Sequence, residues 1–226
     1  MFDGPRGRGV PGRGSLSSPP IEPWIASFVT LLVTVDPIGS APIFAALTAG
    51  HTSAERARVA RRGVAIAAAV LLGFALAGEI LLEALGIELD SFRIAGGVLL
   101  FLLSIDMLMV RHSGLRTTTE SEEKESGQRA DISVFPLAIP LVAGPGAMTS
   151  VVLLMSRAER DLARSALVIG ELLLVLFLTL VAFLGAARLM RVLGITGVNV
   201  VTRVAGILLS ALAVQFIVDG VRAVVG

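Results

Sequence analysis

An aspartate in the middle of an apolar stretch is the residue of this chain best suited to chemistry. Asp36 lies within the apolar segment 24–49, and Pro37, Gly39 and Pro42 follow it closely. A carboxylate at bilayer depth costs at least ~2.5–3.5 kcal/mol on insertion scales, so it needs partners there. Proline lacks an N–H and glycine loosens the backbone, so we predict a helix break at Asp36 that must face protein or water.

A second break of the same construction is predicted in the other half of the chain. Pro136 and Pro140 precede the run Ala143-Gly144-Pro145-Gly146, which carries no charge. Unpaired N–H groups at the start of a half-helix suit a carboxylate, and unpaired carbonyls at the end of one suit an ammonium group. Two facing breaks therefore match a zwitterionic amino acid. The alternative interpretation is that these prolines only kink helices for packing.

The predicted substrate site combines both breaks. Backbone N–H groups near Gly39, Ser40, Gly146 and Ala147 would hold the carboxylate, and Asp36 with the carbonyls of the breaks would hold the ammonium group. Hydroxyls just after the breaks could add hydrogen bonds. The predicted substrate-binding residues are Asp36, Pro37, Ile38, Gly39, Ser40, Ala143, Gly144, Pro145, Gly146, Ala147 and Thr149.

Three further polar residues are candidates for gating or charge pairing. Arg93 and Arg203 begin two apolar segments and would pair with Asp36 or with the substrate carboxylate, and Gln215 lies inside the last segment. The alternatives are that both arginines extend to the membrane interface, that one forms a structural salt bridge with Asp36, and that Gln215 faces a neighbouring helix.

Several classes of function are excluded by composition. The chain has no cysteine and only two histidines, so thiolate chemistry and a histidine-rich metal site are not expected. It has no GxxxxGK[ST] loop for nucleotide phosphates. We expect no catalytic residues, no metal site, no nucleic-acid partner and no cofactor beyond a coupling H⁺ or Na⁺.

Hydrophobicity places the chain in a membrane. Hydrophobic residues make up 54% of its 226 residues and charged residues 16%, against about 25% charged in a soluble domain. Apolar runs of 18 or more residues without period-two alternation predict transmembrane helices rather than a barrel. The six predicted segments are 24–49, 63–85, 92–110, 132–156, 163–187 and 200–225.

The two halves of the chain resemble each other. The run RIAGGVLL at Arg93 matches RVAGILL at Arg203, and Pro37 precedes Arg93 by 56 residues while Pro145 precedes Arg203 by 58. A three-span repeat has an odd number of crossings, so its second copy is inverted, as in many transporters. We predict an all-α membrane protein of two inverted three-helix repeats, 23–110 and 132–226, with a disordered tail, 1–22, and a charged linker loop, 111–131.

Orientation and the path of the broken segments stay open at this level. With six full crossings, ten arginines and lysines lie on one side and seven on the other, which favours both termini outside. If the first and fourth segments were re-entrant hairpins, nearly all basic residues would share one side. Half-segments of about 12 residues cover ~18 Å, which suits either arrangement.

At these residues the chain resembles the MarC family of bacterial membrane proteins, also called the SnatA or neutral amino acid transporter family. The resemblance rests on DPIGSAP at Asp36, FRIAGG at Phe92, PLAIPLVAGPG at Pro136 and VQFIVDG at Val214. It implies six spans and transport of glycine, alanine and similar amino acids. The family also accommodates Asn at the position of Asp36, which favours hydrogen bonding over proton carriage.

These observations predict a multi-pass secondary transporter of small neutral amino acids in the bacterial inner membrane. Its two inverted repeats would alternate access around the shared site, with coupling to a proton or ion. Its partners would be the amino acid substrate and the lipid bilayer. The alternative function is a channel-like exporter of another small solute.

Overall fold

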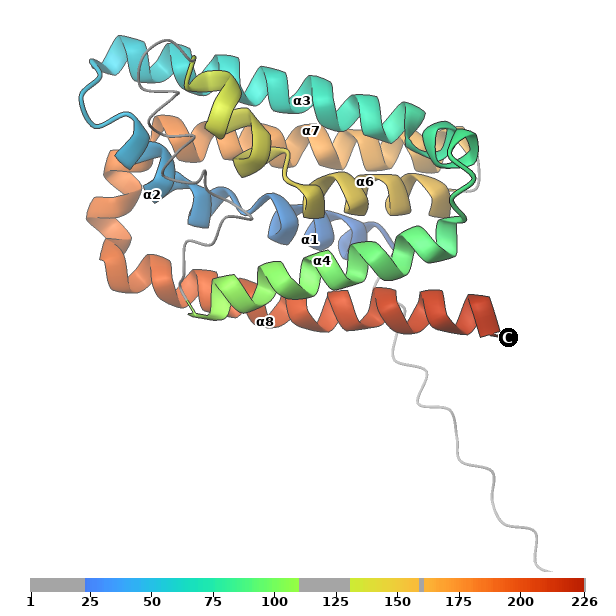
Figure 1. Cartoon of the computed structure of the whole chain (residues 1–226). Helices are drawn as coiled ribbons and strands as arrows, with labels where there is room; N and C mark the ends of the chain where they lie inside the picture. The colour runs from blue at the N-terminus through green and yellow to red at the C-terminus, as the bar shows by residue number, and fades with distance from the viewer. Residues whose placement is uncertain (1–22, 110–130, 159–160, 226) are drawn as a thin grey trace, which may run out of the picture.

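The computed structural model describes residues 23–109, 131–158 and 161–225, which form a bundle of helices (Figure 1). Five stretches are long and apolar enough to cross a membrane, and a sixth consists of two helices bent at a break. The prediction of a six-span all-α membrane protein is confirmed. The predicted tail and nearly all of the linker loop lie outside the described residues. The elements are α1 (Pro23–Val35), α2 (Pro37–Leu47), α3 (Ser53–Ala84), α4 (Leu89–Met109), η1 (Ser133–Val142), α6 (Pro145–Arg157), α7 (Leu162–Leu184) and α8 (Ala186–Val225).

Two helices begin earlier than the apolar pattern predicted. α3 starts at Ser53 because Thr52 and Glu55 form a capping box, in which each side chain bonds the other residue's backbone N–H. α8 starts at Ala186 and turns at Gly194, which has a positive φ of 62°. Hydrophobicity marks the part of a helix that lies in lipid, whereas caps and turns decide where the helix begins.

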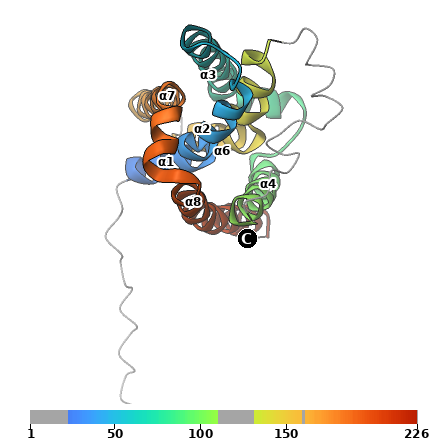
Figure 2. The same cartoon turned by 90° about the vertical axis from the view of Figure 1, so that its left-hand side faces the viewer.

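The two broken spans occupy the middle of the bundle. Seen end-on, α1, α2 and α6 lie near the centre, with α3, α7, α4 and α8 around them (Figure 2). More than half of the first span is buried, against about a third of the four unbroken spans. Backbone groups freed by a break are therefore kept away from lipid, as the cost of an unpaired backbone group requires.

The first broken span runs beside α7 in the same direction. The Ser27 hydroxyl, near the start of α1, donates a hydrogen bond of 2.5 Å to the carboxylate of Glu171 in the middle of α7. Near the ends of both spans, the rings of Phe44 and Phe183 stack with centroids 4.7 Å apart. These contacts join the first half of the chain to the second.

The second broken span runs beside α3 in an equivalent way. A Cβ on Gly63 would lie 2.5 Å from the Leu137 side chain, and one on Gly78 would lie 2.5 Å from Val152. Gly63 and Glu171 are equivalent positions of the two halves, 108 residues apart, and the same offset relates Phe44 to Val152. Each broken span thus packs on the second helix of the other half, and the two broken spans run in opposite directions (Figure 1). Such packing of each half on the other is expected of inverted repeats.

The path of the second broken span distinguishes a crossing from a re-entrant hairpin. Its start is tied to the start of α3 by an ion pair between Arg62 and Asp131. It bends by 56° between η1 and α6, yet α6 continues along α3 as far as Gly78. A re-entrant hairpin would return toward Arg62. The second broken span is therefore a crossing and not a hairpin.

The third helices of the two halves, α4 and α8, pack antiparallel through glycines. A Cβ on Gly97 would lie 2.8 Å from the Ala213 carbonyl oxygen, and one on Gly206 would lie 3.2 Å from that of Ser104. Small residues let membrane helices approach to backbone contact, so both glycines have a packing role. Gly96 packs on α6 instead, against Thr149.

Candidate functional site

The first break is centred on Asp36, as predicted. Asp36 adopts the left-handed conformation (φ 51°, ψ 69°), which separates α1 from α2. Its N–H still donates to the Leu32 carbonyl at 3.0 Å, and its own carbonyl accepts from Ser40 N–H at 3.0 Å. Its carboxylate accepts a hydrogen bond from Gly39 N–H at 2.9 Å and so caps α2. Pro37 occupies the first position of α2, where no N–H is needed.

The second break follows from prolines and glycine together. Phe135 and Ile139 each precede a proline and have extended backbone angles near φ −130° and ψ 124°, because the proline ring excludes the helical conformation before it. Gly144 then provides the N-cap of α6, and Pro145 its first residue. No side chain caps α6, so its first free N–H groups, those of Gly146 and Ala147, have no intrahelical acceptor.

A small cavity lies between the α6 N-terminus and the first broken span, and we call it the central cavity. Its volume is about 10 Å³, close to the space that one water molecule needs. Thr34, two residues before Asp36, lines it from α1, so the two breaks lie next to each other. The cavity is lined by Thr34, Leu99, Leu103, Pro140, Leu141, Gly144, Pro145, Gly146 and Ala147.

A larger groove lies on the other side of the first break, and we call it the α7–α8 groove. Its volume is about 640 Å³, and its walls are mostly apolar side chains of α1, α7 and α8. Two charged residues line it: Asp36, which is 4% exposed, and Arg188, which is exposed near the start of α8. The first broken span contributes Leu32, Val33, Asp36, Pro37 and Ile38.

Equivalent positions of the two broken spans line the two spaces. Adding 108 to the five residues that the first span contributes to the groove gives 140, 141, 144, 145 and 146, and all five line the central cavity. The two halves therefore present the same backbone feature to a space beside each break. One of these spaces is wide and the other is narrow.

The groove and the cavity offer opposite hydrogen-bonding groups. Pro37 and Pro42 lack the N–H groups that would bond the carbonyls of Val33 and Ile38, so these carbonyls have no intrahelical donor. Together with the Asp36 carboxylate, they are acceptors at the first break. On the side of the cavity, Gly146 and Ala147 offer donors at the positive end of α6.

Comparison with known proteins places the chain in a family. Residues 21–225 match the model of the MarC family integral membrane proteins. This chain belongs to the MarC family. A UPF0056 membrane protein of Methanocaldococcus jannaschii is 39% identical over 89% of this chain and 97% of its own length. The relative YvbG of Bacillus subtilis is 35% identical over 86% and 92%, and YhcE of Escherichia coli is 34% identical over 87% and 91%. No solved structure matches the chain.

The structure of this MarC-family chain brings most of the predicted site residues to the two breaks. Gly39 lies against the Asp36 carboxylate, and the buried Ser40 hydroxyl donates to the Asp36 carbonyl at 2.7 Å. Ala143 is buried directly before the α6 cap. Thr149 is the exception in the second break, because it packs on Gly96 of α4 and does not line the central cavity.

The residues predicted to act as gates lie elsewhere. Arg93 pairs with Asp90 of its own helix at 2.8 Å, and Arg203 is exposed on α8. Gln215 is exposed and donates to Asp219 at 2.6 Å. None of the three lines the central cavity or the groove, so their role in gating stays a prediction.

Two polar residues near the breaks were missed at the sequence level. Thr34 lines the central cavity, and Ser150 is a fully buried neighbour of Thr149. Among the residues that the structure describes, no group of three metal-ligating side chains is found.

Proposed function

We propose that this protein is a secondary transporter of small neutral amino acids such as glycine and alanine, acting by alternating access of two inverted repeats. The observation that carries the proposal is that the same five positions of each broken span line a space beside the break. Transporters with inverted repeats bind substrate at such discontinuous helices.

The chemistry of the two breaks supports a zwitterionic substrate. Carbonyls freed by Pro37 and Pro42 stand with the Asp36 carboxylate at the first break and suit an ammonium group. The N–H groups of Gly146 and Ala147 stand on the cavity side and suit a carboxylate. An α-amino acid carries both kinds of charged group, so it matches the acceptors of the first break and the donors of the second.

The unequal size of the two spaces fits alternating access. The groove beside the first break measures about 640 Å³ and reaches Asp36, while the cavity beside the second measures about 10 Å³. If the halves exchanged conformations, the cavity would widen and the groove would close. The cycle would draw on coupling to H⁺ or Na⁺, in the bacterial inner membrane.

The proposal is tested with purified protein in detergent and in proteoliposomes. We expect glycine to raise the melting temperature of the wild type and to exchange saturably, with competition by alanine. Asp36→Ala and Gly146→Val should weaken glycine binding at least ~10-fold, since a hydrogen bond to a charged group contributes about 1.5–3 kcal/mol. Gly170→Val is the control, because a Cβ there meets nothing within 4 Å.

The outcome that overturns the residue assignment is unchanged glycine affinity in both site variants. Flux that rises linearly with concentration, without competition, would instead indicate a channel-like exporter. Absence of binding and of flux for every small amino acid would refute the transport proposal itself.

A further inference from the structure

A glutamate in the membrane-spanning part of α7 has no role in the candidate site. Glu171 lies in the middle of α7 and is the one charged residue of the apolar run 165–187. Its side chain is half-buried. An ionised carboxylate at membrane depth is costly, and ionisable residues inside transmembrane segments often belong to proton relays. Glu171 therefore calls for an explanation that the two breaks do not give.

The hydrogen bonds around Glu171 suit a carboxyl group that gains and loses a proton. Ser27 Oγ lies 2.5 Å from Glu171 Oε2 and 3.0 Å from the Trp24 carbonyl oxygen. A hydroxyl has a single proton and cannot donate it to both oxygens. When Glu171 is ionised, Ser27 donates to the carboxylate. When Glu171 is protonated, its own O–H donates to Ser27 Oγ and Ser27 donates to the Trp24 carbonyl, so that both contacts are hydrogen bonds.

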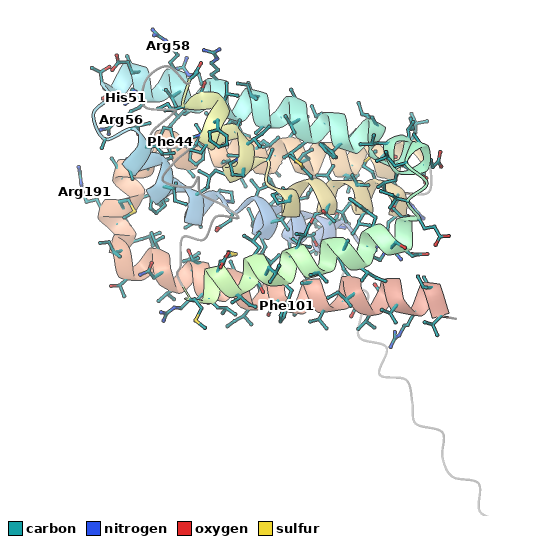
Figure 3. All side chains as sticks on the ribbon, viewed as in Figure 1. Phe44, His51, Arg56, Arg58, Phe101 and Arg191 are labelled. Atoms are coloured by element: carbon teal, nitrogen blue, oxygen red, sulfur yellow. The ribbon has the colours of Figure 1, made fainter. Side chains whose placement is uncertain are left out.

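No cation among the described residues forms an ion pair with Glu171. α1 and α2 carry no titratable side chain, and Asp36 between them caps α2. The arginines that begin α3 and α8 lie at the opposite end of the bundle (Figure 3). The other charged groups on α7 and on the helices packed against it are either paired with each other (Arg157 with Asp219, Arg164 with Asp161) or exposed (Glu79, Glu83, Arg203, Arg222).

We propose that Glu171 is the proton-binding site that couples transport to H⁺, and that Ser27 positions its carboxyl group. This inference rests on the proposed function. The contact joins the first broken span of one half to α7 of the other, and these shift against each other if the halves exchange conformations. An ionised Glu171 that leaves Ser27 loses its hydrogen-bond donor in apolar surroundings, which costs more than the same step for a neutral carboxyl group. Uptake of H⁺ by the carboxylate, which gives the neutral carboxyl group, therefore frees the span to move, and release of H⁺ holds it again.

The proton site occurs in one half of the chain only. The position equivalent to Glu171, 108 residues earlier, is Gly63, and the position equivalent to Ser27 is Phe135. Neither side chain binds a proton, so the inference predicts one proton per transport cycle. A difference of one pH unit across the membrane then accumulates a neutral amino acid up to ~10-fold, because a tenfold concentration ratio and one pH unit correspond to the same free energy.

Proteoliposomes separate exchange from proton coupling. The wild type should exchange glycine at equal pH, and it should accumulate glycine up to ~10-fold across one pH unit when the membrane potential is clamped. Glu171→Gln keeps the shape of the side chain and its hydrogen bond with Ser27 but cannot release a proton. We expect this variant to exchange glycine near the wild-type rate and to lose accumulation. Glu79→Gln, which changes an exposed glutamate of α3, is the matched control and should behave as the wild type does.

A second variant tests the positioning role of Ser27. Ser27→Ala removes the donor to the ionised carboxylate, so Glu171 holds its proton more tightly, and the pH at which uptake falls to half of its maximum should rise. Ser27→Thr restores a hydroxyl and should restore the wild-type pH profile. A merely structural role would lower uptake at every pH without moving the profile. This profile also decides the question if Glu171→Gln does not fold.

The outcomes distinguish the inference from the proposed function. Accumulation by Glu171→Gln equal to that of the wild type would overturn the inference alone, as would wild-type accumulation driven by a Na⁺ gradient and not by a pH gradient. Loss of exchange in a folded Glu171→Gln would also overturn it, because the residue would then act in translocation rather than in coupling. An unmoved pH profile in Ser27→Ala would remove the positioning role. A wild type that does not exchange glycine would refute the proposed function and the inference with it.

Discussion

At the residue scale, Asp36 joins a structural role to its place in the candidate site. Its carboxylate caps α2 through Gly39 N–H, and the same residue lines the α7–α8 groove. A side chain that caps a helix is oriented by its hydrogen bond to the backbone N–H. The left-handed conformation of Asp36 is tolerated since Asp is among the residues that adopt it most readily.

Gly39→Ala tests how tightly this cap is built. A Cβ at Gly39 would lie 2.1 Å from Asp36 Oδ2, so the carboxylate must leave the cap. We expect destabilisation of about 1–3 kcal/mol, seen as a lower melting temperature, together with weaker glycine binding. Gly73→Ala in α3 is the control, since nothing lies within 4 Å of its Cβ and alanine favours a helix. Equal melting temperatures for the two variants would contradict this account.

At the scale of elements, the second broken span is held at its start by Asp131, which we call the anchor. Asp131 precedes η1, accepts hydrogen bonds from the Ser133 hydroxyl at 2.5 Å and the Ser133 N–H at 3.1 Å, and pairs with Arg62 of α3. Because η1 contains two prolines and extended residues, it has few regular backbone bonds of its own. The anchor therefore sets where this irregular element meets the bundle.

Stability at low pH should report on this anchor. The hydrogen bonds from Ser133, with the Arg62 charge, hold the pKa of Asp131 below its ordinary value of 3.8. Since the folded pKa is the lower one, the stabilisation is complete above about pH 3.8 and is lost as the pH falls through the folded value. We expect the melting temperature of the wild type to fall more steeply below pH 4 than that of Asp131→Asn. Parallel curves for the two proteins would refute the role of the anchor.

At the scale of the whole molecule, charge divides the bundle into two ends. Arginines gather where α2 meets α3 and α7 meets α8, as Arg56, Arg58 and Arg191 show (Figure 3). Among the residues that the structure describes, most acidic side chains lie toward the opposite end, and three of its arginines pair with them: Arg93 with Asp90, Arg157 with Asp219 and Arg164 with Asp161. From the positive-inside rule we predict that the arginine-rich end faces the cytoplasm. Pro23, at the start of α1, then lies on the outer side.

Cysteine labelling can measure this orientation directly, because the chain has no cysteine of its own. Ser53 lies at the arginine-rich end and Ser91 at the acidic end, and both are exposed. A membrane-impermeant maleimide added to intact cells should label Ser91→Cys and leave Ser53→Cys unlabelled until the membrane is opened. The reverse pattern would mean that the protein is inserted the other way round.

Features that depend on neighbouring residues were determined by the sequence alone. The breaks at Asp36-Pro37 and Gly144-Pro145 lie where predicted, because a missing proline N–H acts on a carbonyl only four residues away. The spans follow from hydrophobicity for an equally local reason, since a run of apolar residues is excluded from water whatever its neighbours are.

Only the tertiary structure decided which groups meet. It packed Thr149 against Gly96 of α4 and left it out of the central cavity, because packing on α3 and α4 sets the rotation of α6. It also carried the second broken span along α3 as a crossing. These outcomes depend on contacts between residues far apart in the chain, and no local pattern records how helices rotate and align when they pack.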